Sequence, residues 1–181
     1  MSSSTAPHAL DPGRDPRVIA YCQASGRDVV RADGSALSTP AVRSLWGWWQ
    51  SARGEGEAGP PARRSFDIAA YPALAPNLFM VERCAGGFRL RLAGEAFVEM
   101  FGRRKGHEWL TEAPEPLART MAGYFDFVTE SGWPHRSTGR LKCAWADWFS
   151  FESLACPLGG EDLGRLLGVA VKLPEERPAP E

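Results

Sequence analysis

The sequence has few cysteines, and they form no recognisable pattern. The four of them, Cys22, Cys84, Cys143 and Cys156, contain no CxxC pair and have no histidine at zinc-site spacing. They therefore predict neither a disulfide framework nor a structural zinc site. The simplest interpretation is a cytoplasmic chain whose thiols stay reduced.

Long apolar runs and an excess of one charge are also missing. No hydrophobic stretch approaches the length of a membrane span, and residues 1–16 lack the basic start and apolar core of a secretion signal. The formal net charge is −1, whereas a nucleic-acid-binding surface usually leaves a clear excess of Lys and Arg. We therefore expect neither membrane nor nucleic acid as a partner.

Motifs of the common enzyme classes are absent as well. The sequence has no P-loop, no GxSxG elbow, no HExxH and no dinucleotide-binding fingerprint. Glu95 and Glu99 stand one helical turn apart, a spacing typical of the wet edge of an amphipathic helix. We predict no enzymatic activity. An unrecognised α+β enzyme is kept as a third hypothesis, and it requires Glu152, His107 or His135 to converge in one cleft.

Composition divides the chain into three parts. Residues 1–36 carry Ser, Pro, Gly, Asp and Arg with little periodicity, which predicts a flexible arm with one short apolar piece at 18–21. Residues 37–173 are predicted to form a single domain. Residues 174–181 are polar and Pro-rich, and we expect a disordered tail. We also expect no output domain after Leu173.

An aromatic-rich helix is predicted over residues 39–53. Thr39 is a plausible N-cap and Pro40 a favoured first residue. The helix is apolar over so much of its surface that it needs cover on more than one side. It either lies across its own domain or also meets a second copy of the protein. The candidate interface residues are Leu45, Trp46 and Trp49.

The hydrophobic period changes from two to helical at Gly94. Residues 77–93 alternate in the manner of a hairpin that turns at Gly86 and Gly87, and apolar residues then recur at helical spacing up to Phe101. A loop with at most one helical turn follows. The segment 116–132 has one buried helical face, and Gly132 ends it.

Three further strands are predicted at residues 133–141, 148–158 and 165–173. The order of elements is then strand, strand, helices and three strands, which predicts an α+β domain whose helices pack on one face of an antiparallel sheet.

This order resembles the PAS fold, in which a five-stranded antiparallel sheet cradles short helices. The stretch from LWGWWQSAR to NLFMVE is similar to the opening of a family of small bacterial PAS proteins, largely alphaproteobacterial, with an aromatic helix before a P-R-x-x-FD segment. FRLRLAGEAFVEMFGRRKGHEW and FESLACPLG resemble two later motifs of that family. The resemblance covers roughly residues 41–173, and AYPALAPNLF departs from the usual proline placement.

The resemblance implies that the helix after Gly94 walls a central cavity. A plain packed core is the alternative, because Phe and Met at helical spacing are ordinary core residues. Glu152 interrupts an apolar strand and is expected to pair with Arg89 or Arg91. The candidate ligand-pocket residues are Phe97, Met100, Phe101, Trp109, Met121, Tyr124, Phe125 and Val128.

No cofactor or metal is expected. Haem-binding PAS proteins usually supply a histidine from the longest helix, and 116–132 contains none. Light-sensing PAS proteins carry a reactive cysteine in an Asn-Cys-Arg motif beside flavin, and none of the four cysteines has that context. Both groups are disfavoured, and an unidentified small molecule is a candidate occupant.

The predicted function is therefore that of a stand-alone cytoplasmic PAS protein. It would act as a non-enzymatic sensory or regulatory module that signals as a homodimer or through a separate signalling protein. The alternative is a pure interaction adaptor without a ligand. A sizeable cavity beside Phe97, Tyr124 and Phe125 favours the sensor, whereas a filled core with exposed tryptophan favours the adaptor.

Overall fold

The computed structural model describes residues 10–53, 59–142 and 148–174. Residues 1–9, most of the predicted tail, most of the connector after the aromatic helix and Cys143 lie outside this range. Within it, no helix is both long and apolar enough to cross a membrane. The helices are α1 (Pro16–Ser25), α2 (Pro40–Arg53), α3 (Glu95–Phe101) and α4 (Pro116–Ser131), with short 3-10 turns η1 (Arg63–Ser65), η2 (Ile68–Ala70), η3 (Pro72–Asn77) and η4 (Gly160–Asp162).

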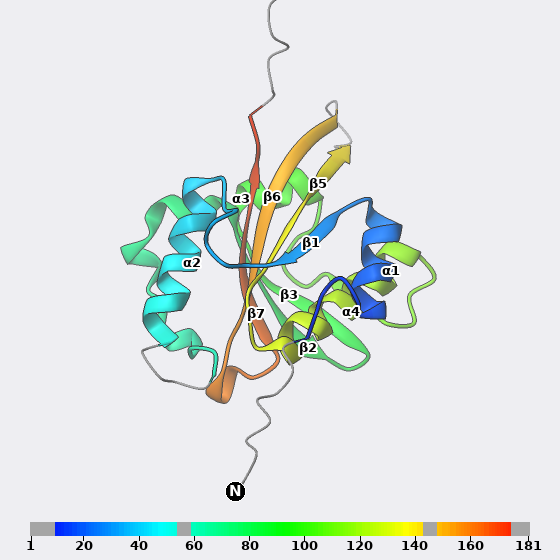
Figure 1. Cartoon of the computed structure of the whole chain (residues 1–181), viewed down its shortest axis with the longest axis horizontal. Helices are drawn as coiled ribbons and strands as arrows, with labels where there is room; N and C mark the ends of the chain where they lie inside the picture. Colours follow the sequence, from blue (N-terminus) through cyan, green and yellow to red (C-terminus); the bar gives the residue numbers. More distant parts are fainter. Residues whose placement is uncertain (1–9, 54–58, 143–147, 175–181) are drawn as a thin grey trace, which may run out of the picture.

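A single antiparallel sheet runs through the middle of the molecule (Figure 1). Its strand order is β1-β5-β6-β7-β2-β3-β4. The α+β class and the five expected strands are confirmed, but the sheet gains one strand at each edge. The strands are β1 (Asp28–Arg31), β2 (Leu78–Cys84), β3 (Gly87–Ala93), β4 (Glu108–Leu110), β5 (His135–Lys142), β6 (Trp148–Pro157) and β7 (Arg165–Lys172).

The edge strand β4 lies where irregular chain was predicted. Three residues are too few for alternation to be visible in the sequence. They pair with β3, placing Trp109 opposite Phe88. This pairing keeps Trp109 only 6% exposed, so burial of one large aromatic side chain favours the strand.

The prediction of a flexible arm is wrong for residues 10–36. Asp15 caps α1 by accepting a hydrogen bond from the Arg17 N–H at 2.9 Å, and Pro16 takes a favoured first position. Gly26, with φ of +65°, ends the helix. Val18 and Tyr21, one turn apart, enter the main hydrophobic cluster. This apolar stripe is short, and only its tertiary partners make it a stable helix.

Helices cover both faces of the sheet (Figure 1). Neighbouring residues of a strand point to opposite faces, so Leu154 packs beneath α2 while Ala155 packs on the side of α4. The prediction that α2 lies across its own domain is borne out by this packing. The expected arrangement of helices on one face holds for α1, α3 and α4 alone.

A close backbone approach requires glycine at position 94, where the strand β3 leads into the helix α3. Its φ of −67° is ordinary for any residue, so conformational freedom is not the reason for glycine. A Cβ atom here would lie 2.2 Å from the Pro76 carbonyl oxygen and 2.3 Å from that of Ala75. Glycine therefore lets η3 pack directly against the start of α3.

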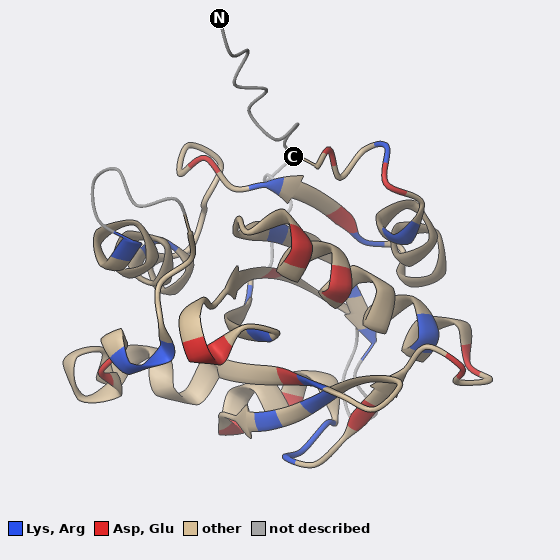
Figure 2. Cartoon of the chain, turned by 90° about the horizontal axis from the view of Figure 1, so that it is seen from below, with Lys and Arg blue, Asp and Glu red and all other residues tan. Residues whose placement is uncertain are grey.

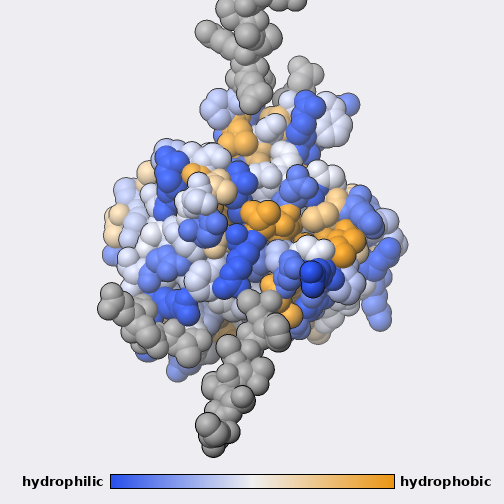
Figure 3. Space-filling view, viewed as in Figure 1, coloured by the Kyte–Doolittle hydropathy of each residue, from blue (hydrophilic) through white to orange (hydrophobic). Residues whose placement is uncertain are grey.

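Charged residues of both signs are interspersed over the fold (Figure 2). A small apolar area lies over α1 and β1 on the face seen in Figure 3, where Ile19 is 40% and Val30 44% exposed. The mixture of positive and negative side chains among the described residues agrees with the formal net charge of −1.

Candidate ligand cavity

A cavity of about 170 Å³ lies between α3, α4 and the sheet. A pocket of about 150 Å³ accommodates a molecule of the size of benzene, so this space suits a single ring with a small substituent. The core is therefore not completely filled at the position where the PAS resemblance implies a cavity.

Most of the predicted pocket residues line this space. They come from α3, β4 and α4, and the lining members are Phe97, Met100, Phe101, Trp109, Met121, Tyr124 and Phe125. Val128 is fully buried in the same hydrophobic cluster but does not line the cavity. Ligand contact by the lining residues stays a prediction.

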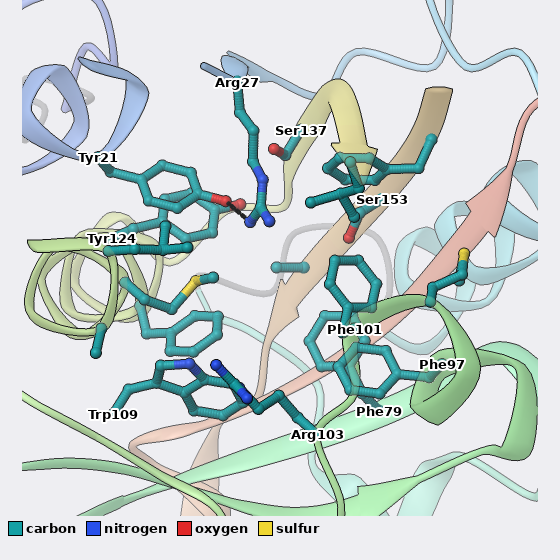
Figure 4. A pocket seen from close by; sticks show the side chains of 18 of the residues that line it. Tyr21, Arg27, Phe79, Phe97, Phe101, Arg103, Trp109, Tyr124, Ser137 and Ser153 are labelled. Carbon is teal, nitrogen blue, oxygen red and sulfur yellow. Dashed lines mark hydrogen bonds between the residues drawn. The ribbon is translucent and has the colours of Figure 1, made fainter. Parts of the chain in front are cut away.

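The apolar wall is a chain of aromatic contacts (Figure 4). The Phe97 ring lies 5.0 Å from that of Phe79 on β2 and 4.8 Å from that of Phe101. The rings of Trp109 and Phe125 meet edge to face at 5.5 Å. Such pairs favour one relative orientation, so the wall has a defined shape.

The polar end of the cavity comes from the N-terminal segment. Arg27, directly before β1, points into the cavity between Tyr21 on one side and Ser137 and Ser153 on the other (Figure 4). Arg27 donates a hydrogen bond of 2.6 Å from Nη1 to the Tyr21 hydroxyl oxygen. Neither residue was a predicted site residue, because both fall in the segment interpreted as a flexible arm.

Arg27 is a buried cation without a carboxylate partner among the described residues. Its exposed fraction is 5%, and its Nε has no hydrogen-bond partner there. Its guanidinium carbon lies 5.1 Å from the centre of the Phe151 ring, 5.6 Å from that of Tyr21 and 5.7 Å from that of Phe101. The aromatic faces stabilise the charge partly, but its hydrogen-bonding capacity is unfilled.

Two serines on adjacent central strands complete this polar end. Ser137 is on β5 and Ser153 on β6, and both line the cavity. The Ser137 Oγ is buried and has no hydrogen-bond partner among the described residues. It is therefore a second polar atom at the cavity whose hydrogen-bonding capacity is unused.

Tyr124 stacks on Tyr21 and stays neutral. Their ring centres are 4.5 Å apart and their planes differ by 9°. Burial raises the pKa of the Tyr124 hydroxyl well above its usual value. This contact ties α4 to α1, so the N-terminal helix helps to fix the side of the cavity.

The exposed charged members of the lining mark the opening of the cavity. They are Arg103, Glu115 and Lys142. Two of these side chains are basic and one is acidic, and Arg27 adds a positive charge deeper inside. The charged residues of the lining are therefore positive on balance.

The predicted interface residues of α2 are mostly unavailable. Leu45 and Trp49 are fully buried, and the Trp49 indole N–H donates to the Pro157 carbonyl at 2.9 Å. Only Trp46 keeps part of its surface exposed, and it packs against Trp49 and Trp133. As an interface, the prediction fails for Leu45 and Trp49, because the chain's own sheet covers them.

Glu152 has a structural role, with a partner other than the one predicted. Its carboxylate accepts hydrogen bonds of 2.8 Å from the backbone N–H groups of Ser38 and Thr39, and one of 2.7 Å from the Arg136 Nε. Burial would raise its pKa, but these donors outweigh burial and hold the pKa below its usual value. Arg136, rather than Arg89 or Arg91, is the cation, and the pair anchors the start of α2.

The residues required by the enzyme hypothesis do not converge. Glu152, on β6, is hydrogen-bonded to the start of α2, His135 packs against Phe127, and His107 packs against Trp109. None of the three lines the cavity.

Metal ligands and cysteines give no second site. Among the described residues, no group of three or more His, Cys, Asp or Glu side chains is placed to hold a metal ion. Of the cysteines that the structure describes, Cys22, Cys84 and Cys156, none lines the cavity.

Comparison with known proteins gives one family. A family model described as PAS domain matches residues 37–170. The crystal structure of the Rhodobacter sphaeroides LOV protein is similar at a TM-score of 0.38 and 19% identity, covering 60% of this chain and 69% of that one. No curated protein matches the sequence. Because the family match covers well over half of the sequence, the chain belongs to the PAS domain family.

Proposed function

We propose that this PAS domain is a sensory or regulatory module of bacterial signal transduction that binds a small molecule in its central cavity. It acts without catalysing a reaction and communicates through contacts with a second copy or with a separate signalling protein. The observation that carries the proposal is the cavity itself, beside Phe97, Tyr124 and Phe125.

The walls of the cavity support ligand binding. They are largely aromatic, with a few polar groups gathered at one end, which is the usual construction of a small-molecule site. Within the described part of the chain, the Arg27 Nε and the Ser137 Oγ have no hydrogen-bond partner. A ligand that stabilises one conformation over another is sufficient to change a protein contact.

Native mass spectrometry of the protein purified from its own host tests this proposal. A retained compound that is lost on denaturation is the expected result. An empty protein that binds no compound from a fragment library under native conditions contradicts the sensor and favours the adaptor. The same spectrum gives the oligomeric state, and comparison with Trp46→Ala tests whether α2 contributes to self-association.

A further inference from the structure

The polar end of the cavity carries information about the ligand's charge. We propose that the ligand is a small organic carboxylate with a compact apolar body, and that Arg27, Tyr21 and Ser137 hold its carboxylate. This inference rests on the proposed function, since it names the chemical class of the molecule that the cavity takes.

Charge is the first argument. A buried ionised group normally has a partner of opposite charge, because desolvation without one is costly. Arg27 is 5% exposed and has no acidic partner in the described part of the chain. The guanidinium is also the side chain best suited to bind a carboxylate, through two parallel N–H donors.

Three residues with hydrogen-bond donors line this end of the cavity: Tyr21, Arg27 and Ser137. The Arg27 Nε and the Ser137 Oγ have no hydrogen-bond partner among the described residues. Tyr21 accepts from Arg27 at 2.6 Å, which leaves the proton of its own hydroxyl for another acceptor. Donors without a local acceptor favour an acceptor-only group such as a carboxylate over an ammonium or an alkyl group.

Gly139 gives Arg27 room to enter the cavity. A Cβ on Gly139 would lie 2.9 Å from the Arg27 Cγ and 3.3 Å from its Cα. The aromatic rings of Phe151, Tyr21 and Phe101 then hold the guanidinium from three directions. The positive charge is therefore fixed in position before a ligand arrives, which reduces the cost of ordering on binding.

Size and lining define the rest of the ligand. The volume of about 170 Å³ suits one ring or a short branched chain, as a pocket of roughly 150 Å³ holds benzene. The wall opposite Arg27 includes Phe97 and Trp109. An inorganic anion would leave this apolar surface uncovered, so the anion is expected to carry an apolar body.

Calorimetric titration of the full chain with matched acids and amides tests the inference. The probes are benzoate, phenylacetate and cyclohexanecarboxylate, each beside its carboxamide, with inorganic phosphate as a further anion. At least one acid is expected to bind about tenfold or more tightly than its amide, since a hydrogen bond to a charged group contributes at least that factor.

Two variants locate the effect. Arg27→Met removes the charge at similar volume and is expected to abolish the preference for the acid. Arg104→Met, at an exposed position that does not line the cavity, is the matched control and is expected to keep it. Ser137→Ala is expected to weaken acid binding several-fold and supplies a milder variant should Arg27→Met fail to fold.

Three results with the unaltered chain overturn the inference: amides that bind as well as the acids, acids that do not bind at all, or phosphate that binds as tightly as the best acid. If native mass spectrometry then shows a retained neutral compound, the proposed function survives while the charge assignment fails. Acid binding unchanged in Arg27→Met also overturns it, because the carboxylate then lies elsewhere.

Discussion

His135 is the residue whose protonation most clearly opposes folding. It is fully buried, and burial lowers its pKa to about 4, further reduced by Arg31 and partly offset by the Trp133 carbonyl. That carbonyl can only accept, so Nδ1 carries the proton in the 2.9 Å contact. Nε2 is then an unprotonated, buried nitrogen.

The first prediction concerns stability as pH falls. Below about pH 6.5 the unfolded chain binds a proton at His135, whereas the folded chain binds it only when the pH falls to about 4. The free energy of unfolding should therefore drop by about 3 kcal/mol across that window, measured by urea unfolding. His135→Asn should flatten this slope. An unchanged slope in His135→Asn would contradict the assignment.

The second prediction concerns Glu152→Gln. Its lowered pKa means that the folded chain gains stability from the carboxylate above about pH 4.5 and loses it as pH falls further. The amide removes the charge from the contact with Arg136 and from the two backbone donors at α2. We expect a loss of about 2–3 kcal/mol at pH 7, measured by urea unfolding. A loss below about 0.5 kcal/mol, which is the range of an ordinary surface substitution, would show that α2 does not depend on this anchor.

At the scale of elements, opposite changes in stability are expected when alanine replaces two glycines, one at the start of a helix and one inside a helix. Gly94→Ala places a Cβ about 2 Å from two carbonyl oxygens of η3, so η3 and α3 must separate. We expect a loss of about 2 kcal/mol or more. Gly47→Ala, within α2, meets nothing within 4 Å and is expected to gain about 0.5–1 kcal/mol. Thermal unfolding of both variants measures this difference, and equal effects would contradict it.

Elements with strong local signals were predictable from the sequence. The hairpin of β2 and β3, the helix α4 with Gly132 after it, and the last three strands follow from periodicity and turn residues. The additional edge strands β1 and β4 have four and three residues. Segments this short show no period of their own, and pairing with β5 and β3 decides their structure.

The candidate site likewise contains one part that could be predicted from the sequence and one part that could not. The aromatic wall was predictable, because Phe97, Phe101, Tyr124 and Phe125 lie on helical faces. The polar end was not, because Tyr21 and Arg27 reach the cavity only through contacts distant in sequence. The signals that could have found α1 were the Asp15-Pro16 start and Gly26 at its end. The partner of Glu152 was mistaken for the same reason: cross-strand register is not visible in the sequence.

For the whole molecule, residues 10–36 are predicted to be part of the folded unit. A chain that begins at Leu37 keeps the segment that matches the family but loses Val18 and Tyr21 from the core and β1 from the sheet. We expect about 3 kcal/mol or more of lost stability, measured by urea unfolding. Hydrogen exchange should increase along β5.

The control for this deletion is a matched pair on α1. Val18→Ala, at a position 2% exposed, should cost about 1–2 kcal/mol. Ile19→Ala, at a position 40% exposed, should change stability little. If the shortened chain is as stable as the full one, and both variants are neutral, the N-terminal segment does not belong to the folded unit.

The position of Arg27 outside the family match has a consequence for chemical selectivity among relatives. The apolar wall is built by the segment common to the family, whereas the only buried guanidinium among the described residues comes from the segment in front of it. In the proposed carboxylate site, the charge that selects the ligand therefore comes from a residue outside the family match. If the segment before residue 37 is exchanged between two PAS proteins, we expect the preference for an anionic or a neutral compound to be transferred with it. The sequence of the segment that matches the family stays unaltered in this exchange.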